Sequence, residues 1–308
     1  MLDRLKQIGL IAAKALAVIA VCAGIYFVGI NVYYASQKTY SLYSWGNDIN
    51  GQCTKTPAYD DIIAADAGYS HSCAIRKNGK FIAWGKNSFG ECNMWGEENT
   101  KFKNVSAGQH FTIALRRDGS IAACGNNQLG ECDVPKGNDY KSISAGVTHC
   151  LALKKNGSLA AWGDNEFGQL KYPMGNDFVA VAAGGGFSLA LKKDGTIVSW
   201  GDNQLGQCNA PRGRGFVKID AGFSHGIALS KKGEVICWGF NNHGQIERIK
   251  GNDFVDVSAG GGHTMALKKD GTIVSWGTDS FGQTKEPKEK NIVAISTFGA
   301  HNLALKKK

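Results

Sequence analysis

The stretch that decides the fold is FVAVAAGGGFSLALKKDGTIVSWGDNQLGQCNAP, residues 178–211. Its Trp-Gly pair has counterparts throughout the 308-residue chain, and from the third one onward they are spaced 38 residues apart. The seven positions are Trp45-Gly46, Trp84-Gly85, Cys124-Gly125, Trp162-Gly163, Trp200-Gly201, Trp238-Gly239 and Trp276-Gly277. A fixed period of this length indicates one supersecondary unit repeated along the chain, with a continuous shared core.

Within this unit the residue pattern predicts short strands and no helix. Val179–Ala183, Ser188–Lys192 and Thr196–Trp200 are apolar or β-branched runs, which favour strands. Asp194-Gly195 predicts a two-residue hairpin with a type I′ turn. A short fourth strand is expected near Gln207–Asn209. Four short antiparallel strands with tight turns are typical of a propeller blade.

The two ends of the repeat region complement each other. Residues 40–46 supply a third strand without its first two, and residues 295–306 supply a first and second strand without a third. Pairing them would complete one blade and remove the free sheet edges. The sequence therefore predicts an all-β, seven-bladed β-propeller of four-stranded blades over residues 39–308, closed by its N- and C-terminal strands.

The repeat also resembles that of a known family. The string A-G-x-x-H-x-x-A-L-K-x-D-G-x-x-x-x-W-G-x-N-x-x-G-Q is similar to the repeat of the regulator of chromosome condensation superfamily. It is more similar to the bacterial branch with short repeats, which includes the propeller inhibitors of β-lactamases. The resemblance covers residues 40–308 and implies the propeller fold. For function it implies a nucleotide-exchange factor for a small GTPase, an enzyme inhibitor or an interaction scaffold.

Residues 1–38 differ in character from the repeats. Ile8 to Ile30 are apolar apart from Lys14, and 23 such residues are long enough to cross a bilayer as a helix. Arg4 and Lys6 precede this run, so the positive-inside rule puts the N-terminus in the cytoplasm. The propeller is then expected on the outer side, periplasmic or extracellular. A cleaved signal peptide and a lipoprotein signal at Cys22 are the alternatives.

Two recurring residue types are interpreted as structural. Five blades share a histidine slot, which holds phenylalanine in the other two, so packing or a local hydrogen bond explains it better than a metal. These residues are His71, His149, His225, His263 and His301, with Phe111 and Phe187. Cysteines at another repeat position alternate with Leu, Ile and Thr, as expected of a small packing slot. We expect no metal site and no cofactor.

Candidate partner contacts break the repeat or vary within it. Trp95 belongs to no repeat position and lies in the longest connection, 93–101, so it is a candidate interface residue. Five residues after each Trp position comes a variable residue that either docks a partner or fills the gap to the next blade. This set is Asn50, Phe89, Leu129, Phe167, Leu205, His243 and Phe281, of which Phe89, Phe167, His243 and Phe281 are candidates for contact.

Basic pairs end the second strand of each unit and predict a cationic rim on one edge of the propeller. They are Arg76-Lys77, Arg116-Arg117, Lys154-Lys155, Lys192-Lys193, Lys231-Lys232 and Lys268-Lys269, with Lys306–Lys308 at the end of the chain. With a net charge of +9, this rim is either a solvated edge or a binding surface for anionic lipid or an acidic protein. Aromatic residues do not alternate with these cations, so no nucleic acid is expected.

Catalytic motifs are missing from the sequence. It contains no G-x-S-x-G elbow, phosphate-binding loop, H-E-x-x-H motif or paired catalytic carboxylates. The unit length stays at 38 to 40 residues, which leaves no room for the inserted wedge of the exchange factors. The leading hypothesis is a membrane-anchored, non-enzymatic propeller that presents the loops of one face to a protein partner. An enzyme inhibitor and an exchange factor are the alternatives.

Overall fold

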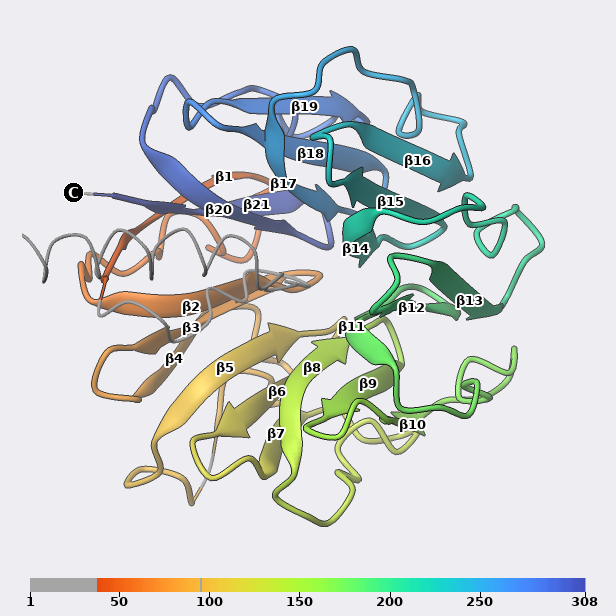
Figure 1. Cartoon of the computed structure of the whole chain (residues 1–308). Coiled ribbons are helices and arrows are strands. Elements are labelled where there is room, and N and C mark those ends of the chain that lie inside the picture. The colour runs from red at the N-terminus through yellow and green to blue at the C-terminus, as the bar shows by residue number, and fades with distance from the viewer. Residues whose placement is uncertain (1–37, 95, 308) are drawn as a thin grey trace, which may run out of the picture.

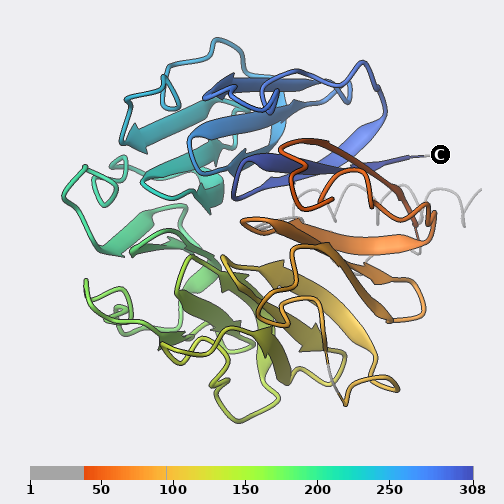
Figure 2. The same ribbon diagram turned by 180° about the vertical axis from the view of Figure 1, so that it is seen from behind.

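The computed structural model describes residues 38–94 and 96–307, and within them the chain is all-β (Figure 1). Strands pair antiparallel into seven three-stranded sheets, which stand side by side around a common axis (Figures 1 and 2). No helix in these two ranges is long and apolar enough to cross a membrane. The predicted membrane segment, residues 8–30, lies outside the described residues.

Each sheet has an innermost, a middle and an outermost strand. The innermost strands are β2 (Ile62–Ala67), β5 (Phe102–Ala107), β8 (Tyr140–Ala145), β11 (Phe178–Ala183), β14 (Phe216–Ala221), β17 (Phe254–Ala259) and β20 (Ile292–Thr297). The middle strands are β3 (His71–Arg76), β6 (Phe111–Arg116), β9 (His149–Lys154), β12 (Phe187–Lys192), β15 (His225–Ser230), β18 (His263–Lys268) and β21 (His301–Lys306). The outermost strands are β4 (Phe81–Gly85), β7 (Ile121–Gly125), β10 (Leu159–Gly163), β13 (Ile197–Gly201), β16 (Val235–Gly239), β19 (Ile273–Gly277) and β1 (Ser41–Gly46).

The two chain ends share one sheet, as predicted. The N-terminal strand β1 pairs with β21, from Ser41 opposite Lys306 to Gly46 opposite His301, and β20 completes the sheet. Successive innermost strands contact one another around the whole circle, including β20 with β2. The ring is therefore closed by hydrogen bonds between segments at opposite ends of the sequence.

The predicted fourth strand is wrong, because each described sheet has three strands. After Gly201 the chain curls into turns instead of pairing along β13. The Asn203 side chain accepts the backbone N–H of Cys208 at 2.9 Å, and the Gly206 carbonyl accepts that of Asn209 at 3.0 Å. Local acceptors thus occupy backbone donors that a fourth strand would need.

The hairpin between the middle and outermost strands also differs from the prediction. Lys192 N–H donates to the Thr196 carbonyl, and Gly195 N–H donates to the Lys192 carbonyl, which defines a three-residue loop. Gly195 has a φ of +82°, whereas Asp194 is not among the positive-φ residues. The loop is therefore a type I turn followed by a left-handed glycine, and a two-residue type I′ turn is excluded.

Apolar side chains fill the space between neighbouring sheets. One cluster joins Phe187 and Leu191 of β12 to Ile219 and Trp238 of the next sheet. The Trp238 indole N–H donates across this boundary to the Gln207 carbonyl at 2.9 Å. The tryptophan slot thus packs blade against blade, and burying such large aromatic surfaces is the main apolar contribution to the ring.

Cysteines in the repeat slot are free thiols that hold the turns, in agreement with their structural interpretation. Each Sγ donates to the carbonyl six residues earlier in the chain, at 3.1–3.3 Å. Burial raises the pKa of these thiols, to about 12 in Cys53, Cys92 and Cys132 and to about 11 in Cys208. They remain protonated and unreactive at neutral pH.

The propeller has two distinct faces, set by the strand register. Ala67 pairs with Ser72 and His71 pairs with Gly85, so the turns 68–70 and 86–91 emerge at the same end of their sheet. We call this end of the seven sheets the turn face. The hairpins, such as 77–80, emerge at the opposite end, which we call the hairpin face.

Candidate functional site

The turn face carries a ring of partly exposed apolar side chains at one repeat position. Five members leave 44–49% of their surface exposed: Phe89, Leu129, Phe167, Leu205 and Phe281. His243 is also exposed, and Asn50 is half-buried. Some of these residues also pack against the next sheet: Phe167 lies so close to Gly186 that a Cβ there would be 3.0 Å from its ring. The exposed part of these five side chains is available to a partner, and the docking interpretation stays a prediction.

A buried glutamine or glutamate clamps every one of these turns. Gln169 Oε1, for example, accepts the backbone N–H of Phe167 at 2.9 Å. The same bond occurs in all seven sheets, with Glu91 and Glu131 in place of glutamine in two of them. Because the backbone beneath each ring residue is fixed, presenting its side chain to a partner costs little ordering entropy.

Aromatic side chains also cover the centre of the turn face. Tyr69 and Phe223 come from distant sheets and stack with ring centroids 5.6 Å apart, and Phe298 meets Phe223 edge-on at 5.2 Å. Towards the periphery, Phe89 stacks on His110 at 4.9 Å, and His110 in turn contacts the edge of Tyr69. Aromatic contacts therefore connect the outer ring to the axis on one side of the turn face.

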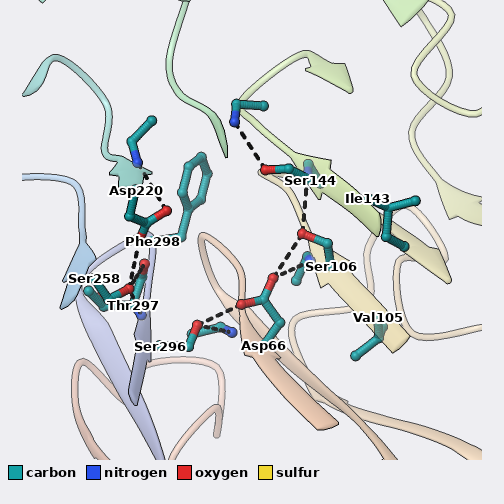
Figure 3. A pocket seen from close by; sticks show the side chains of 15 residues that line it. Asp66, Val105, Ser106, Ile143, Ser144, Asp220, Ser258, Ser296, Thr297 and Phe298 are labelled. Atoms are coloured by element: carbon teal, nitrogen blue, oxygen red, sulfur yellow. Dashed lines mark hydrogen bonds between the residues drawn. The ribbon is translucent and has the colours of Figure 1, made fainter. Parts of the chain in front are cut away.

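Beneath this cover, side-chain hydrogen bonds line the axis (Figure 3). Asp66 Oδ2 accepts the Ala107 N–H of the next sheet at 2.9 Å and the Ser106 hydroxyl at 3.0 Å. Its other oxygen accepts the Ser296 hydroxyl at 2.6 Å, which links the first and last innermost strands. A cavity of about 30 Å³ lies beside these groups, which is room for water but for no larger ligand.

The axial bonds follow one repeat position around the ring: Asp66, Ser106, Ser144, Ala182, Asp220, Ser258 and Ser296. In six sheets its side-chain oxygen accepts a backbone N–H from the next sheet. Ala182 has no such oxygen, and the Ala221 N–H is taken instead by Asp220 at 2.9 Å. Sequence analysis missed these residues, although aligning the position directly before each Ala-Gly would have revealed the two aspartates.

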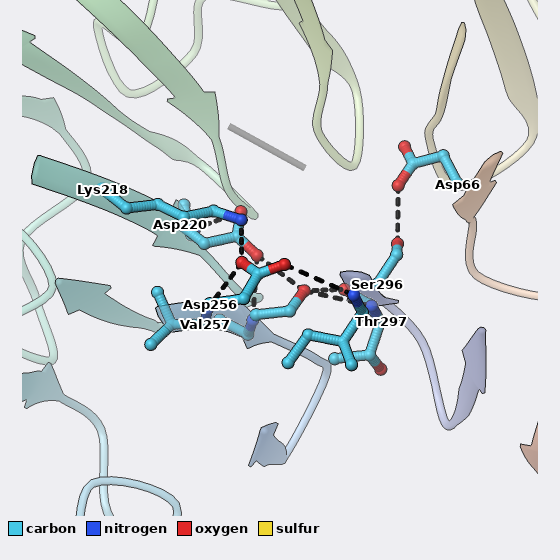
Figure 4. A network of polar contacts seen from close by, with 11 residues as sticks. Asp66, Lys218, Asp220, Asp256, Val257, Ser296 and Thr297 are labelled. Atoms are coloured by element: carbon cyan, nitrogen blue, oxygen red, sulfur yellow. Dashed lines mark hydrogen bonds and ion pairs between the residues drawn. The ribbon is translucent and has the colours of Figure 1, made fainter. Parts of the chain in front are cut away.

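The axial charges are occupied by structural bonds (Figure 4). Burial raises the pKa of Asp66 and that of Asp220, the latter to about 6. Lys218 of β14 and Asp256 of β17 are 5% and 7% exposed and form an ion pair between adjacent sheets. Asp256 also accepts the Val257 N–H at 2.7 Å. Each of these carboxyls bonds to a neighbouring strand, so they hold the ring together.

The histidine slot forms a second set of bonds between sheets. His149 Nε2 lies 2.9 Å from Ser188 Oγ of the next sheet, and this hydroxyl donates to the Gln169 carbonyl at 2.9 Å. His149 must therefore donate, which fixes its proton on Nε2. The other four histidines make the same bond, to Ser72, Thr112, Thr264 or Asn302. Burial lowers the pKa of all five, to about 3 or about 4.

The two phenylalanines of this slot face residues that accept no strong hydrogen bond. In the next sheet, the position that supplies a hydroxyl or amide to each histidine holds Cys150 for Phe111 and Gly226 for Phe187. The slot therefore holds histidine only where the next sheet supplies an acceptor. This agrees with the structural interpretation, and no group of side chains able to hold a metal ion occurs in the described ranges.

On the hairpin face the basic pairs divide into two roles. The first member lies against its own sheet, as Lys192 does with Asp177 at 3.2 Å and over the Phe178 ring at 5.4 Å. Equivalent ion pairs hold Arg76, Arg116, Lys154, Lys268 and Lys306. The second members, Lys77, Arg117, Lys155, Lys193 and Lys269, are exposed. In the sheet of β15 the basic pair Lys231-Lys232 lies one residue later than in the other sheets, so Ser230 takes the first position and Lys231 the second. Trp95 lies outside the described residues.

A comparison with known protein families matches segments that have the same boundaries as the repeats. The profile described as the regulator of chromosome condensation (RCC1) repeat matches residues 62–91, 102–131, 140–169, 178–207, 216–245 and 254–283, together more than half of the chain. The chain belongs to the regulator of chromosome condensation repeat family. Each matched segment of this RCC1-repeat protein runs from an innermost strand to the clamping Gln or Glu.

Solved structures support the family's fold at low sequence identity. Prp20p from Saccharomyces cerevisiae, in a structure reported with its binding to Gsp1p and histones, is 18% identical with a TM-score of 0.75, covering 90% of this chain and 94% of its own. Human WBSCR16 is 16% identical with a TM-score of 0.73, covering 87% and 99%. The ectodomain of the Physcomitrella patens receptor kinase CR4 is 24% identical with a TM-score of 0.63, covering 77% and 68%. A search among curated protein sequences found no significant match.

Proposed function

We propose that this RCC1-repeat protein is a membrane-anchored scaffold that binds a protein partner through its turn face. The observation that carries the proposal is the ring of five apolar side chains, each 44–49% exposed and each on a turn clamped by a buried side chain. Rigid aromatic and aliphatic groups on fixed backbone are the usual anchors of protein interfaces. The axial carboxyls are engaged in structural bonds, which favours binding over catalysis.

Within this ring, Phe89, Phe167, His243 and Phe281 are the proposed contact residues. The Phe-bearing turns surround the aromatic centre at Tyr69 and Phe223, so a partner that covers the face can reach both. We also assign Trp95 to this interaction, since an unrepeated tryptophan in the longest connection has no role in the repeat.

Anchoring is proposed from the apolar run at residues 8–30, with the N-terminus in the cytoplasm and the propeller outside. Reporter fusions after Lys308 test this topology directly. Activity of a periplasmic reporter and silence of a cytoplasmic one are expected. The reverse result would move the propeller to the cytoplasmic side of the membrane.

Binding is tested with a photo-crosslinking amino acid in place of Leu129 or Leu205, on the turn face, and in place of Val255, which is equally exposed but near the hairpin face. Adducts are expected from the two turn-face positions only. Changing both Phe167 and Phe281 to alanine should remove the adducts, whereas Val255→Ala should leave them intact. Adducts that persist in the Phe167/Phe281 double variant would contradict the proposed site.

The same reagents separate two competing activities. An exchange factor would accelerate nucleotide release from the small GTPase that it binds, and an inhibitor of the β-lactamase-binding kind would reduce the rate of a class A β-lactamase on titration. A scaffold does neither. Either activity, if lost in the Phe167/Phe281 double variant, would replace the scaffold function at the same face.

A further inference from the structure

One repeat position is cationic in every sheet and faces solvent on the hairpin face. It is the residue directly after each middle strand, and its seven members are Lys77, Arg117, Lys155, Lys193, Lys231, Lys269 and Lys307. All seven are exposed. We call this set the cationic ring.

The backbone of the cationic ring is fixed in the same way in every sheet. Lys193 N–H donates to the Asp177 carbonyl at 2.8 Å, and the other six members make the same bond to the segment that precedes their innermost strand, at 2.7–3.0 Å. The seven side chains therefore start from equivalent points around the axis. They form a ring of positive charge at one end of the molecule, in which the Arg117 guanidinium also donates to the Lys77 carbonyl at 3.0 Å and Lys155 Nζ to the Asn138 carbonyl at 3.1 Å.

Neighbouring acids compensate this charge only in part. Asp177, Asp139 and their equivalents pair with the cation one position earlier, so those two charges compensate each other. Acidic residues lie in four of the hairpins, as Asp118, Asp194, Glu234 and Asp270. Hydrogen bonds from the Thr196 hydroxyl and backbone hold the Asp194 carboxylate in its own turn and lower its pKa. A net positive ring remains.

We propose that the cationic ring seats the hairpin face on an anionic lipid surface. A planar bilayer can meet all seven cations at once, and each lysine or arginine near such a surface strengthens binding roughly fivefold. A nucleic acid duplex is a cylinder and would contact only part of a flat ring. The seven fixed backbone positions thus fit a flat anionic partner better than a curved one.

The path of the chain favours the same orientation. The described chain enters the propeller at Tyr40, which bridges Ile62 on the hairpin face. This step rests on the proposed anchor: seven residues separate residue 30 from Lys38, and they reach at most about 25 Å. The sheets are six residues deep, or about 20 Å, so placing the turn face on the membrane would use nearly the whole tether. With the hairpin face down, the turn face points away and is open to a partner.

Lysine acylation in nanodiscs tests the proposal on the unmodified full chain. The protein is reconstituted in neutral phosphatidylcholine or in phosphatidylcholine with about one-third phosphatidylglycerol, and a water-soluble acylating reagent is followed by mass spectrometry. Lys155, Lys193, Lys231 and Lys269 should react at least fivefold more slowly in the anionic discs. Lys171 and Lys285, which are exposed beside the turn face, are the internal controls and should not change. High salt should abolish the difference.

Equal reactivity of the ring lysines in both lipids overturns the proposal. Stronger protection by a DNA duplex than by anionic discs overturns it in favour of a nucleic acid. Failure of the protein to enter neutral discs contradicts the membrane anchor but not the ring, because salt-sensitive sedimentation with phosphatidylglycerol vesicles still measures lipid binding. A variant with all four lysines changed to glutamine should lose that sedimentation by at least tenfold while keeping its melting temperature.

Discussion

The histidine bonds between sheets give a prediction that can be worked through quantitatively. The perturbation is a pair of substitutions, His149→Phe and Ser188→Cys, made singly and together. The double variant reproduces a combination that the protein already uses elsewhere, where Phe111 faces Cys150. It replaces the 2.9 Å bond between the two sheets with an apolar contact.

The single variants should be costly and the double variant much less so. Ser188→Cys leaves the buried His149 Nε2–H without a good acceptor, which costs about 1–3 kcal/mol. His149→Phe removes the donor, but the Ser188 hydroxyl keeps its bond to the Gln169 carbonyl, so the loss is one net hydrogen bond, about 1 kcal/mol. In the double variant no donor is orphaned, and we expect a coupling energy of about 1–2 kcal/mol.

Equilibrium urea unfolding of the four proteins at pH 7 measures this coupling. The reverse exchange is the matched control: Phe111→His should destabilise the protein, and adding Cys150→Ser should restore it, because the new hydroxyl supplies the missing acceptor. If the two changes add to within about 0.5 kcal/mol in both pairs, the residues are energetically independent and the reasoning fails.

Three further changes test the axis, the pH response and the turns. Asp66→Asn puts an N–H₂ group where either the Ser296 hydroxyl or the Ala107 N–H needs an acceptor, so thermal unfolding should show a loss of about 1–3 kcal/mol. Stability should fall between pH 7 and pH 5, because the five histidines have folded-state pKa values of about 3 or 4 and are protonated on unfolding below about pH 6.5. Burial raises the pKa of Asp66 and that of Asp220, the latter to about 6, so these two carboxyls favour the folded state as the pH falls, but the five histidines outnumber them. A urea midpoint of unfolding that does not change between pH 7 and pH 5 would contradict this expectation. Gly157→Ala should cost at least about 1 kcal/mol more than Gly213→Ala, since both have positive φ but only the first would place a Cβ 2.2 Å from a carbonyl oxygen.

Features that depend on repetition and apolar pattern could be predicted from the sequence. Seven units, closure by the terminal strands and tryptophan packing between blades follow from the Trp-Gly spacing and the incomplete units at residues 40–46 and 295–306. The histidine slot was also interpreted correctly as a place of packing or local hydrogen bonds, because each histidine bonds a hydroxyl or amide of the next sheet. Each of these arguments compares equivalent positions within one chain.

Competition for backbone donors could not be predicted in the same way. The region around Gln207 has strand-like spacing, but the Asn203 side chain and the Gly206 carbonyl accept the N–H groups of Cys208 and Asn209 that a fourth strand would use. The axial aspartates were missed because the alignment was anchored on tryptophan, at the far end of the unit from Asp66 and Asp220. The exposed fractions of Phe89 and Phe167 depend on how far apart neighbouring sheets lie, and the sequence alone does not give that spacing.

Comparing positions across the seven sheets also separates internal from external roles. Where a residue serves the fold, its identity follows a partner in the next sheet: His149 accompanies Ser188, and Phe187 accompanies Gly226. The cationic ring does not behave in this way, because the bond that its seven members share is made by the backbone and is open to almost any residue. Seven exposed cations on one face repel one another, and the fold offsets this only in part, through the side-chain bonds of Arg117 and Lys155 to backbone carbonyls. The proposed anionic lipid surface, which can meet all seven together, would supply the reason to keep them.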